Sequence, residues 1–334
     1  MTTPPFRHLQ NLDEVPADWR QGIVAIGNFD GVHRGHQQVI NQLRTQAAGH
    51  TGPTLVMSFE PHPRTVFNPT QPVFRLTPAT EKAALLRAMG IDGLISVPFD
   101  RDFAARSADD FVNDILINRL DVHHVAIGYD FHYGKARAGT PQTMLAAGET
   151  AGFAVTVLQP YRDEAGQAIS STAIRQLLQD GDPQQARTLL GYHWFFDAEV
   201  IHGEKRGREL GYPTANMQLP GETRLKHGIY AVKLCRPDGR MMNGVASYGR
   251  RPQFDNGTPL FETYIPGFGG DLYGETLRVA LVDYLRPELK FDSLDGLIAQ
   301  MAQDTEQAIA QLEDYTGWSR LDRALHGPGL TPAT

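Results

Sequence analysis

The first half of the chain alternates short, continuous apolar runs with stretches of helical spacing. Continuous apolar runs are typical of strands that are buried on both faces of a sheet. Between them, apolar residues recur on one helical face, as at Val39, Ile40, Leu43 and Ala47. The runs cover residues 23–26, 55–57, 94–97, 125–127 and 154–157. Because strand–helix alternation implies right-handed crossovers, we predict an α/β fold with a parallel sheet.

Two sites in this half indicate where helices begin. Thr77 precedes Pro78, which predicts an N-cap followed by proline at the first helical position. Ser107 and Asp110 have the spacing of a capping box ahead of Phe111.

The second half changes to a period of two. Apolar and polar residues alternate around 196–200, 230–234 and 277–281, with Gly, Pro and Asn between these segments. This alternation predicts an antiparallel sheet or small barrel. Behind Ser293, apolar residues return to helical spacing from Leu294 to Leu312, so we expect a terminal α-helix against a β-barrel. We interpret 181–191 as a turn-rich boundary, which gives domains at 1–187 and 188–334.

Composition narrows the class of protein. The chain has 334 residues and a formal net charge of −7, which argues against a broad basic surface for nucleic acid. The first twenty residues contain no apolar block, and no run is long enough to span a membrane. The sole cysteine, Cys235, has no partner for an intrachain disulfide. We therefore expect a cytoplasmic protein without membrane or nucleic-acid partners.

The densest candidate chemistry lies at Gly27–His36, between the first predicted strand and the first predicted helix. A helix N-terminus presents unpaired N–H groups that favour phosphate, and glycines allow close approach of the backbone. His33 and His36 add donors for a phosphoryl group. Two histidines three residues apart also occur in surface turns and protein cores. Asp30 could complete a metal site with them, although Arg34 favours phosphate over a cation.

The chain has no Walker A loop and no dinucleotide fingerprint at this position. Instead, GNFDGVHRGH resembles the HxGH nucleotidyltransferases, and more closely the adenylyltransferase module of prokaryotic bifunctional riboflavin kinase/FAD synthetases. Four further blocks fit that family in order: 58–64 (SFEPHPR), 128–134 (GYDFHYG), 139–140 (GT) and 169–175 (ISSTAIR). The resemblance implies a Rossmann-like nucleotidyltransferase domain.

The same resemblance implies roles for individual residues. It places His33 and His36 in catalysis, and His62 and Asp130 near the ATP phosphates and the flavin phosphate. Residues expected at ATP are Gly27, Asn28, Asp30, Gly35, Ser171, Thr172 and Arg175. Simpler roles stay open, since hydroxyls at 170–172 can cap a helix and His62 can occupy a rigid turn between two prolines.

The second half carries a glycine-rich basic segment from Gly203 to Asn216. Such a loop can wrap a polyphosphate, or it can be a plain hairpin. If the segment is extended, Thr214 and Asn216 point the same way, and their oxygens suit Mg²⁺.

This segment resembles the riboflavin kinase signature GxxRGRxLGxPTAN, and blocks at 228–232, 244–252, 261–263 and 271–274 follow it. The resemblance implies Thr214 and Asn216 at magnesium and Glu262 as the base that accepts the ribityl hydroxyl proton. Glycines and arginines expected at ATP are Gly203, Arg206, Gly207, Arg208 and Gly211. A solvated strand glutamate is the alternative for Glu262. Gln253 and Pro266-Gly267 depart from the family pattern.

The two resemblances together imply a bifunctional enzyme that makes FMN from riboflavin and ATP, and then FAD from FMN and ATP, with Mg²⁺ at both sites. One working half, a flavin-binding protein without catalysis, and a metal-dependent hydrolase are the alternatives. The sequence allows a homo-oligomer and does not decide the oligomeric state.

Overall fold

The computed structural model describes residues 5–13, 15–47, 49–162, 166–203, 211–250 and 259–326. They form two compact units, residues 1–171 and 172–334. Each unit has its own sheet, and the two are described separately below.

The first unit is built on a parallel sheet of six strands in the order β1-β4-β3-β2-β5-β6. The strands are β1 (Arg7–Leu9), β2 (Ile23–Ile26), β3 (Thr54–Glu60), β4 (Gly93–Pro98), β5 (His124–Gly128) and β6 (Ala154–Leu158). All five predicted runs are strands, and every neighbouring pair is parallel. The predicted α/β class is therefore confirmed. The short edge strand β1 was not predicted, because Arg7-His8-Leu9 is not an apolar run.

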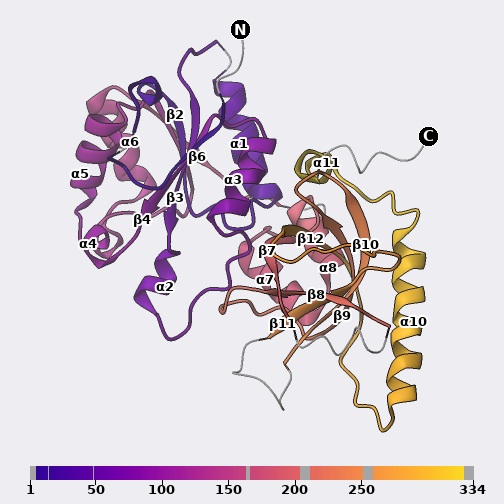
Figure 1. Ribbon diagram of the computed structural model, residues 1–334. Helices are drawn as coiled ribbons and strands as arrows, with labels where there is room; N and C mark the ends of the chain where they lie inside the picture. The colour runs from indigo at the N-terminus through magenta and orange to yellow at the C-terminus, as the bar shows by residue number, and fades with distance from the viewer. Residues whose placement is uncertain are drawn as a thin grey trace. The chain divides into compact units, whose positions relative to one another are not determined.

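Helices cover both faces of this sheet, with α1 and α3 on one side and α5 and α6 on the other (Figure 1). The longer ones are α1 (Arg34–Gln46), α3 (Ala79–Ala88) and α6 (Pro141–Ala151). Shorter segments are η1 (Ala17–Trp19), α2 (Pro63–Phe67), α4 (Arg101–Ala104), α5 (Ala108–Asp110), the π-helical η2 (Phe111–Arg119) and η3 (Lys135–Arg137). Because the sheet is covered twice, residues such as Leu55 and Val125 are fully buried.

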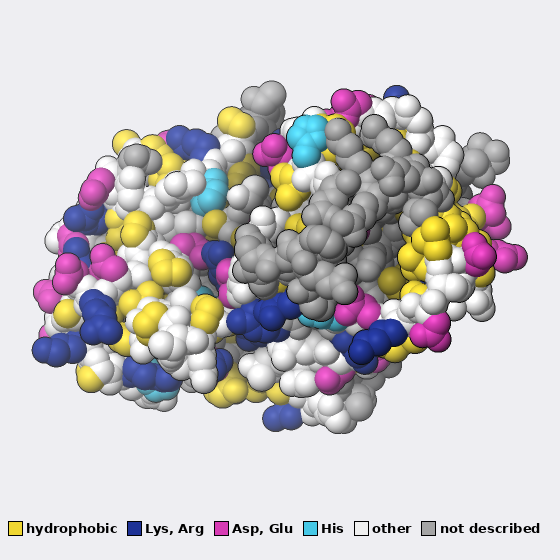
Figure 2. All heavy atoms as spheres, turned by 60° about the horizontal axis from the view of Figure 1, so that its bottom comes forward, with side chains coloured by type: hydrophobic (Ala, Val, Ile, Leu, Met, Phe, Trp, Pro, Cys, Tyr) yellow, Lys and Arg dark blue, Asp and Glu magenta, His cyan; other side chains and the backbone are white. Residues whose placement is uncertain are grey.

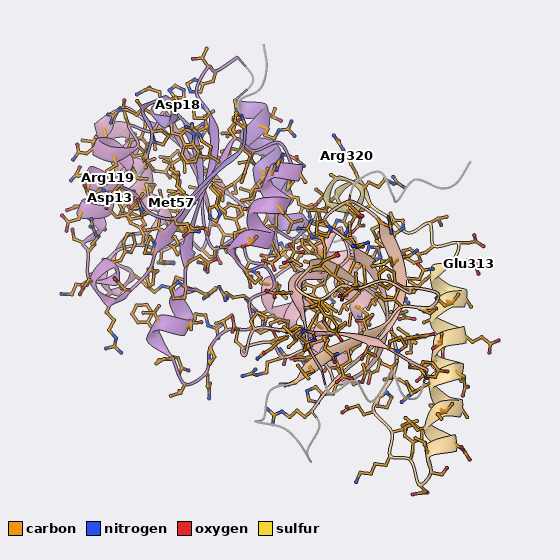
Figure 3. All side chains as sticks on the ribbon, in the orientation of Figure 1. Asp13, Asp18, Met57, Arg119, Glu313 and Arg320 are labelled. Atoms are coloured by element: carbon orange, nitrogen blue, oxygen red, sulfur yellow. The ribbon has the colours of Figure 1, made fainter. Side chains whose placement is uncertain are left out.

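Packing is close at the centre and at the edge of this unit. Met57, labelled in Figure 3, lies buried in the middle of the sheet. On β4, next to the edge strand β1, a Cβ on Gly93 would stand 2.2 Å from the indole ring of Trp19, so this strand position requires glycine. Arg119 donates to Asp13 and Asp114 at the surface, and this contact ties η2 to the N-terminal segment.

One helix start differs from its prediction, and another agrees. Ser107 and Asp110 form the expected reciprocal capping box. Thr77, however, does not cap a helix: Pro78 is the N-cap residue of α3, without a side-chain cap bond. The Thr77 hydroxyl is instead bound to the loop that follows β2. The Thr77 hydroxyl thus bonds to residues distant in the sequence rather than to the N-terminus of α3.

The strand order sets where ligands can bind in this unit. From β2 the chain winds outward through β3 and β4, whereas β5 and β6 lie on the other side of β2. Ile26 pairs with Ile127, so the loops that leave β2 and β5 emerge side by side. In open α/β sheets, the carboxyl edge at such a reversal is the usual ligand site.

The second unit begins with two helices and continues into a closed antiparallel barrel. The helices are α7 (Ser171–Asp180), which starts at the last residue of the first unit, and α8 (Pro183–Leu190). The expectation of a turn-rich stretch at 181–191 is therefore wrong for residues 183–190, which form α8. Asp182 caps α8 with proline at its first position, and Gly191 ends it in the left-handed conformation.

The barrel has the strand order β10-β11-β8-β7-β12-β9. Its strands are β7 (Phe195–Ile201), β8 (Thr214–Gln218), β9 (Gly228–Cys235), β10 (Met241–Gly249), β11 (Leu260–Tyr264) and β12 (Thr276–Arg286). Phe261 packs against Phe196, Tyr230 and Tyr248 inside it. The predicted barrel is confirmed. The side chains of Phe261 and Met217 are fully buried, so their strand neighbours Glu262 and Asn216 face the other way.

The predicted terminal helix is α10 (Leu294–Leu312), capped by Ser293 as expected. Its Ala308 and Leu312 pack on Ala231 and Val282 of the barrel. A further helix, α11 (Arg320–His326), was not predicted. It is anchored by the fully buried Asp322, which accepts the backbone N–H groups of His193 and Ser319.

On the face drawn in Figure 2, acidic and basic side chains are interspersed around the described surface. Among the described residues, no helix is long and apolar enough to cross a membrane.

The α11 anchor makes stability depend on pH through His326. Both ring nitrogens of His326 are buried and have no hydrogen-bond partner among the described residues. Burial, and then the charge of Arg278, lower the pKa of His326 from 6.5 to about 4. Between these values the unfolded chain binds a proton that the folded chain does not.

We therefore predict that the free energy of unfolding of this unit falls as pH drops below 6.5, by up to about 3 kcal/mol near pH 4. His326→Leu should weaken this dependence, whereas the matched change at the exposed His202 should leave it unchanged. Urea titrations followed by hydrogen exchange of β7 and β12 peptides measure the effect. Equal pH dependence in both variants would contradict it.

Candidate functional site

The loop after β2 has an unusual backbone. Phe29 and Val32 have φ values of 46° and 34°, and Gly31 between them has φ 83°. Left-handed values are costly for a β-branched residue such as valine, so surrounding contacts must hold this loop in place. Such strain tends to occur at functional sites.

Those contacts come from the segment that leads into α3. The Asp30 carboxylate accepts the backbone N–H of Thr77 at 3.0 Å, and the Thr77 hydroxyl accepts the N–H of Gly31 at 2.8 Å. Asp30 is only 4% exposed. We call these contacts the Asp30–Thr77 clasp. They give the predicted phosphate residue Asp30 a positioning role.

The loop delivers a histidine pair to the start of α1. His33 is the N-cap residue, and its Nδ1 accepts the backbone N–H of His36 at 3.4 Å. The two imidazole rings are stacked, with centroids 3.7 Å apart. The sequence placed both histidines at a helix start, and the structure brings them into direct contact.

The geometry also sets the protonation of this pair. Because His33 Nδ1 accepts a hydrogen bond, the proton of neutral His33 lies on Nε2. Burial, then the neighbouring His33, then Lys82 hold the pKa of His36 well below its ordinary value. The buried Nδ1 of His36 has no hydrogen-bond partner among the described residues, which favours a proton on Nε2 there too. The geometry thus gives neutral His33 an Nε2–H donor, and burial disfavours the proton that would charge His36.

Three further predicted residues lie around this carboxyl edge. His62 follows β3 and caps α2, with its Nδ1 accepting the N–H of Arg64. Asp130 follows β5 and is exposed. The Ser171 hydroxyl donates to the carbonyl of Asp30 at 2.8 Å, which connects the start of α7 with the loop. Thr172 and Arg175 continue α7 within the second unit.

A groove beside α1 was missed by sequence reasoning. It starts at Gly35, has a volume of about 380 Å³, and is lined from α1 and from residues 156–162 at the end of β6. Arg34 donates to the Tyr161 hydroxyl at 3.3 Å and lies over its ring. No sequence motif indicates this groove, because lining residues such as Gln38 and Val157 belong to no recognisable functional pattern. Only the neighbouring position of α1 and β6 creates it.

Lys82 was also missed. Its side chain is 3% exposed, and its Nζ donates to Ser58 Oγ and Glu60 Oε1, both at 2.9 Å. Arg75 donates to the other oxygen of Glu60 at 3.2 Å. A lysine within a helical pattern gives no signal of burial, so the sequence could not have identified it.

In the barrel, the predicted kinase residues share one face of two paired strands. Asn216 on β8 lies directly opposite Glu262 on β11, and Thr214 lies opposite Tyr264. Directly paired residues project to the same side, and so do residues two apart. Thr214, Asn216 and Glu262 are therefore brought together on the outer face of the barrel.

Gly203 closes over this group. A Cβ at Gly203 would stand 2.5 Å from Asn216 Nδ2, so only glycine allows the chain to cover the amide. Asn216 Nδ2 donates to the carbonyl of Thr214 at 3.2 Å, which leaves Oδ1 as the acceptor of this side chain. Gly211 lies just before β8, with φ 83°. Arg206, Gly207, Arg208 and Gln253 lie outside the described residues.

The alternative of a metal centre built on Asp30, His33 and His36 receives no support. Among the described residues, no three His, Cys, Asp or Glu side chains are grouped so that they could hold a metal ion. Asp30 is engaged with Thr77, and the histidine rings face each other.

Comparison with known proteins gives two family models and many relatives. The FAD synthetase model matches residues 15–173, and the riboflavin kinase model matches residues 190–312. The bifunctional riboflavin kinase/FMN adenylyltransferase of Escherichia coli is 38% identical over 299 residues, covering 90% of this chain and 95% of the relative. The protein of the same description from Listeria monocytogenes is 40% identical, covering 87% and 94%.

A solved structure shows the same fold. The crystal structure described as a macrolide-efflux protein from Streptococcus pneumoniae matches with a TM-score of 0.79 and 29% identity. It covers 91% of this chain and 98% of that chain.

The Asp30–Thr77 clasp can be tested by stability. Thr77→Val keeps the shape of the side chain but leaves the buried N–H of Gly31 without its acceptor, so we predict a loss of about 1–3 kcal/mol in the first unit. Thr80→Val, on the exposed side of α3, is the matched control and should change stability by less than about 0.5 kcal/mol. Urea unfolding followed by hydrogen exchange of first-unit peptides measures both. Similar losses in the two variants would refute the clasp.

Proposed function

Since this chain belongs to the bifunctional riboflavin kinase/FMN adenylyltransferase family, we propose that its two activities use the two residue groups described above. The protein transfers the γ-phosphoryl group of ATP to riboflavin, giving FMN and ADP. It then transfers AMP from a second ATP to FMN, giving FAD and pyrophosphate. The observation that carries the assignment is the presence of two separate candidate groups for binding phosphate, one at the histidine loop after β2 and one on the paired barrel strands β8 and β11.

We assign the adenylyltransferase to residues 1–187 and the kinase to residues 188–334. The extents of the two family matches, 15–173 and 190–312, support this division.

In the adenylyltransferase, a phosphate oxygen of FMN attacks the α-phosphorus of ATP, and the bond to the bridging oxygen of pyrophosphate breaks. This step needs no protein nucleophile, so the protein acts by positioning and charge stabilisation. We propose that the Nε2–H groups of His33 and His36, together with the N-terminal amides of α1, stabilise the phosphates in transit. The loop at Gly27, Asn28 and Gly35 would let the nucleotide approach the backbone.

The remaining residues of this half are assigned by their place on the carboxyl edge. His62 follows β3 and Asp130 follows β5, the strands on either side of β2, and both would hold the flavin phosphate end of FMN. Ser171, Thr172 and Arg175 would bind ATP phosphates. We also propose that the groove at Gly35 binds the adenosine of ATP, because it is lined by apolar residues such as Val39 and by amides such as Gln42.

In the kinase, Glu262 accepts the proton of the ribityl 5′-hydroxyl while the hydroxyl oxygen attacks the γ-phosphorus and ADP leaves. Its register opposite Asn216 supports this role, because the carboxylate stands beside the residue proposed at the metal. Gly203 and Gly211 flank the loop proposed to hold ATP, whose members Arg206, Gly207 and Arg208 lie outside the described residues.

The donors at this site fit magnesium. The Thr214 hydroxyl and Asn216 Oδ1 are hard oxygen ligands on one face, and the Asn216 amide nitrogen is already engaged. We propose that these two oxygens hold Mg²⁺ together with ATP phosphates. The ion would neutralise phosphate charge when bound. A second Mg²⁺ is proposed at the adenylyltransferase with phosphate ligands.

We further propose a cytoplasmic enzyme whose partners are riboflavin, FMN and ATP rather than nucleic acid. The single cysteine, Cys235, is buried and unpaired, which suits a reducing compartment. The net charge of −7 offers little general attraction for nucleic acid.

The direct test is to incubate the protein with riboflavin, ATP and Mg²⁺ and to separate the flavins by chromatography. FMN and then FAD should accumulate. If neither flavin forms, the proposed function is wrong.

In the same assay, His33→Ala combined with His36→Ala should block FAD while FMN still accumulates. The reason is that both Nε2–H donors are lost, and a single preorganised donor already contributes about 10²–10³ in rate. We expect at least about a hundredfold loss in FAD formation. FMN loss of similar size would show that the two halves are not independent.

Conversely, Glu262→Gln should block FMN formation from riboflavin but leave FAD formation from supplied FMN intact. Glutamine keeps the shape of the side chain and cannot accept the hydroxyl proton, so we expect about 10²–10⁴-fold slower phosphorylation. Glu199→Gln, at another polar position of the barrel strands, is the control. Unchanged FMN production by Glu262→Gln would remove this residue from the mechanism.

A further inference from the structure

A carboxylate at the end of β3 is held by cations from two other segments. Glu60 is the last residue of β3, and its carboxylate accepts hydrogen bonds from Lys82 Nζ at 2.9 Å and from Arg75 Nη1 at 3.2 Å. Its backbone carbonyl accepts the N–H of Phe99 at 2.8 Å. The Glu60 and Lys82 side chains are only 17% and 3% exposed. Because burying such charges is costly, a role in positioning explains this cluster better than a role in stability.

The end of β3 determines where His62 lies. In Figure 1, β3 leads into α2, and only Pro61 separates Glu60 from His62. The proline ring fixes its own φ, so the orientation of Glu60 is passed on to His62 through one stiff residue. His62 Nδ1 accepts the N–H of Arg64 at 3.1 Å. The proton of this ring therefore lies on Nε2, the donor that a phosphate oxygen would need.

One segment between α2 and α3 is bound both to this turn and to the loop after β2. The N–H of Val73 donates to Thr65 Oγ1 of α2 at 3.0 Å. Two residues further on, Arg75 donates to Glu60. After another two residues, Thr77 holds the loop that carries the histidine pair. We call the segment from Val73 to Thr77 the brace, because its three contacts connect the two groups.

We propose that the brace sets the position of His62 relative to the histidine pair, and that Glu60 and Arg75 are positioning residues of the adenylyltransferase. The inference rests on the proposed roles of His62 at the flavin phosphate and of His33 and His36 at the ATP phosphates. The FMN phosphate must meet the α-phosphorus of ATP, so the groups that hold the two substrates need a fixed separation. A single segment bound to both groups provides it.

The expected effect of weakening one end of the brace is selective. Glu60→Gln removes the charge that both cations bind, whereas the Asp30–Thr77 clasp at the other end stays intact. His62 should then lose its fixed position, while the loop after β2 keeps its own. Since His62 is proposed to hold FMN before the reaction, the loss should appear in the KM for FMN and not in the KM for ATP.

The test measures FAD formation from supplied FMN by the full-length wild type, Glu60→Gln, His62→Ala and the variant that carries both changes. For Glu60→Gln, we expect the KM for FMN to rise by at least about fivefold and the KM for ATP to stay within about twofold of the wild type. In the His62→Ala background, Glu60→Gln should not raise the KM for FMN further, because Glu60 acts through His62. FMN formation from riboflavin is the internal control and should not change.

Asp114→Asn is the matched control. Asp114 also accepts from two cations, Arg106 at 2.7 Å and Arg119 at 3.2 Å, but it lies on η2, where no residue of the site is assigned. Its KM for FMN should equal that of the wild type. If Glu60→Gln fails to fold, Arg75→Gln replaces it, since the Arg75 side chain is 29% exposed. The same selective rise is expected, and it should again vanish in the His62→Ala background.

Three results would overturn the proposal: an unchanged KM for FMN in Glu60→Gln, an equal rise in Asp114→Asn, or a full further rise when Glu60→Gln is added to His62→Ala. Failure of the proposed function looks different. If the wild type makes no FAD, or if His62→Ala leaves the KM for FMN unchanged, the function assigned to the site is wrong and the brace has no role in it. A raised KM in His62→Ala with an unchanged KM in Glu60→Gln counts against the brace alone.

Discussion

The adenylyltransferase half depends on one buried carboxylate. Asp30 holds the N–H of Thr77, and Thr77 in return holds Gly31, so that a loop with left-handed Phe29 and Val32 keeps its shape. Without this clasp the loop would have no local reason to adopt such φ values. The stacked histidines, the N-cap of α1 and the bond from Ser171 all rest on the same few residues. Strain in the loop is thus offset by hydrogen bonds from a segment far away in the sequence.

In the proposed assignment, the two units would handle phosphate by different physical means. The parallel sheet gathers loops at its carboxyl edge and adds a helix N-terminus, which supplies backbone donors and positive partial charge. The barrel has no such edge and would instead use side chains on one face of paired strands. There, Asn216 and Glu262 meet by antiparallel register, and Gly203 covers the amide because it has no side chain. Each proposed site therefore uses the donors that the architecture of its unit makes available.

The sequence predicted the elements whose signal is local and periodic. Runs such as 23–26 and 125–127 are strands, and the helix behind Ser293 ends at Leu312 as expected. The sequence did not predict features that depend on partners distant in the chain. Thr77 binds the loop after β2 instead of capping α3, and α11 depends on the buried Asp322. In the candidate site, the histidines and Glu262 were found by motif. Lys82 and the groove at Gly35 were not found. The burial of Lys82 and the packing of α1 beside the end of β6 depend on residues that are distant in the sequence, so the local sequence does not indicate them.

The central claim is that one chain carries two complete and independent sites that share FMN as product and substrate. Mixing two defective variants in solution tests it most directly: one lacks His33 and His36, and the other carries Glu262→Gln. Neither variant alone should convert riboflavin to FAD, but the mixture, given riboflavin, ATP and Mg²⁺, should do so, because FMN released by the first is adenylylated by the second. A mixture that yields no FAD, although each variant keeps its remaining single activity, would contradict the account.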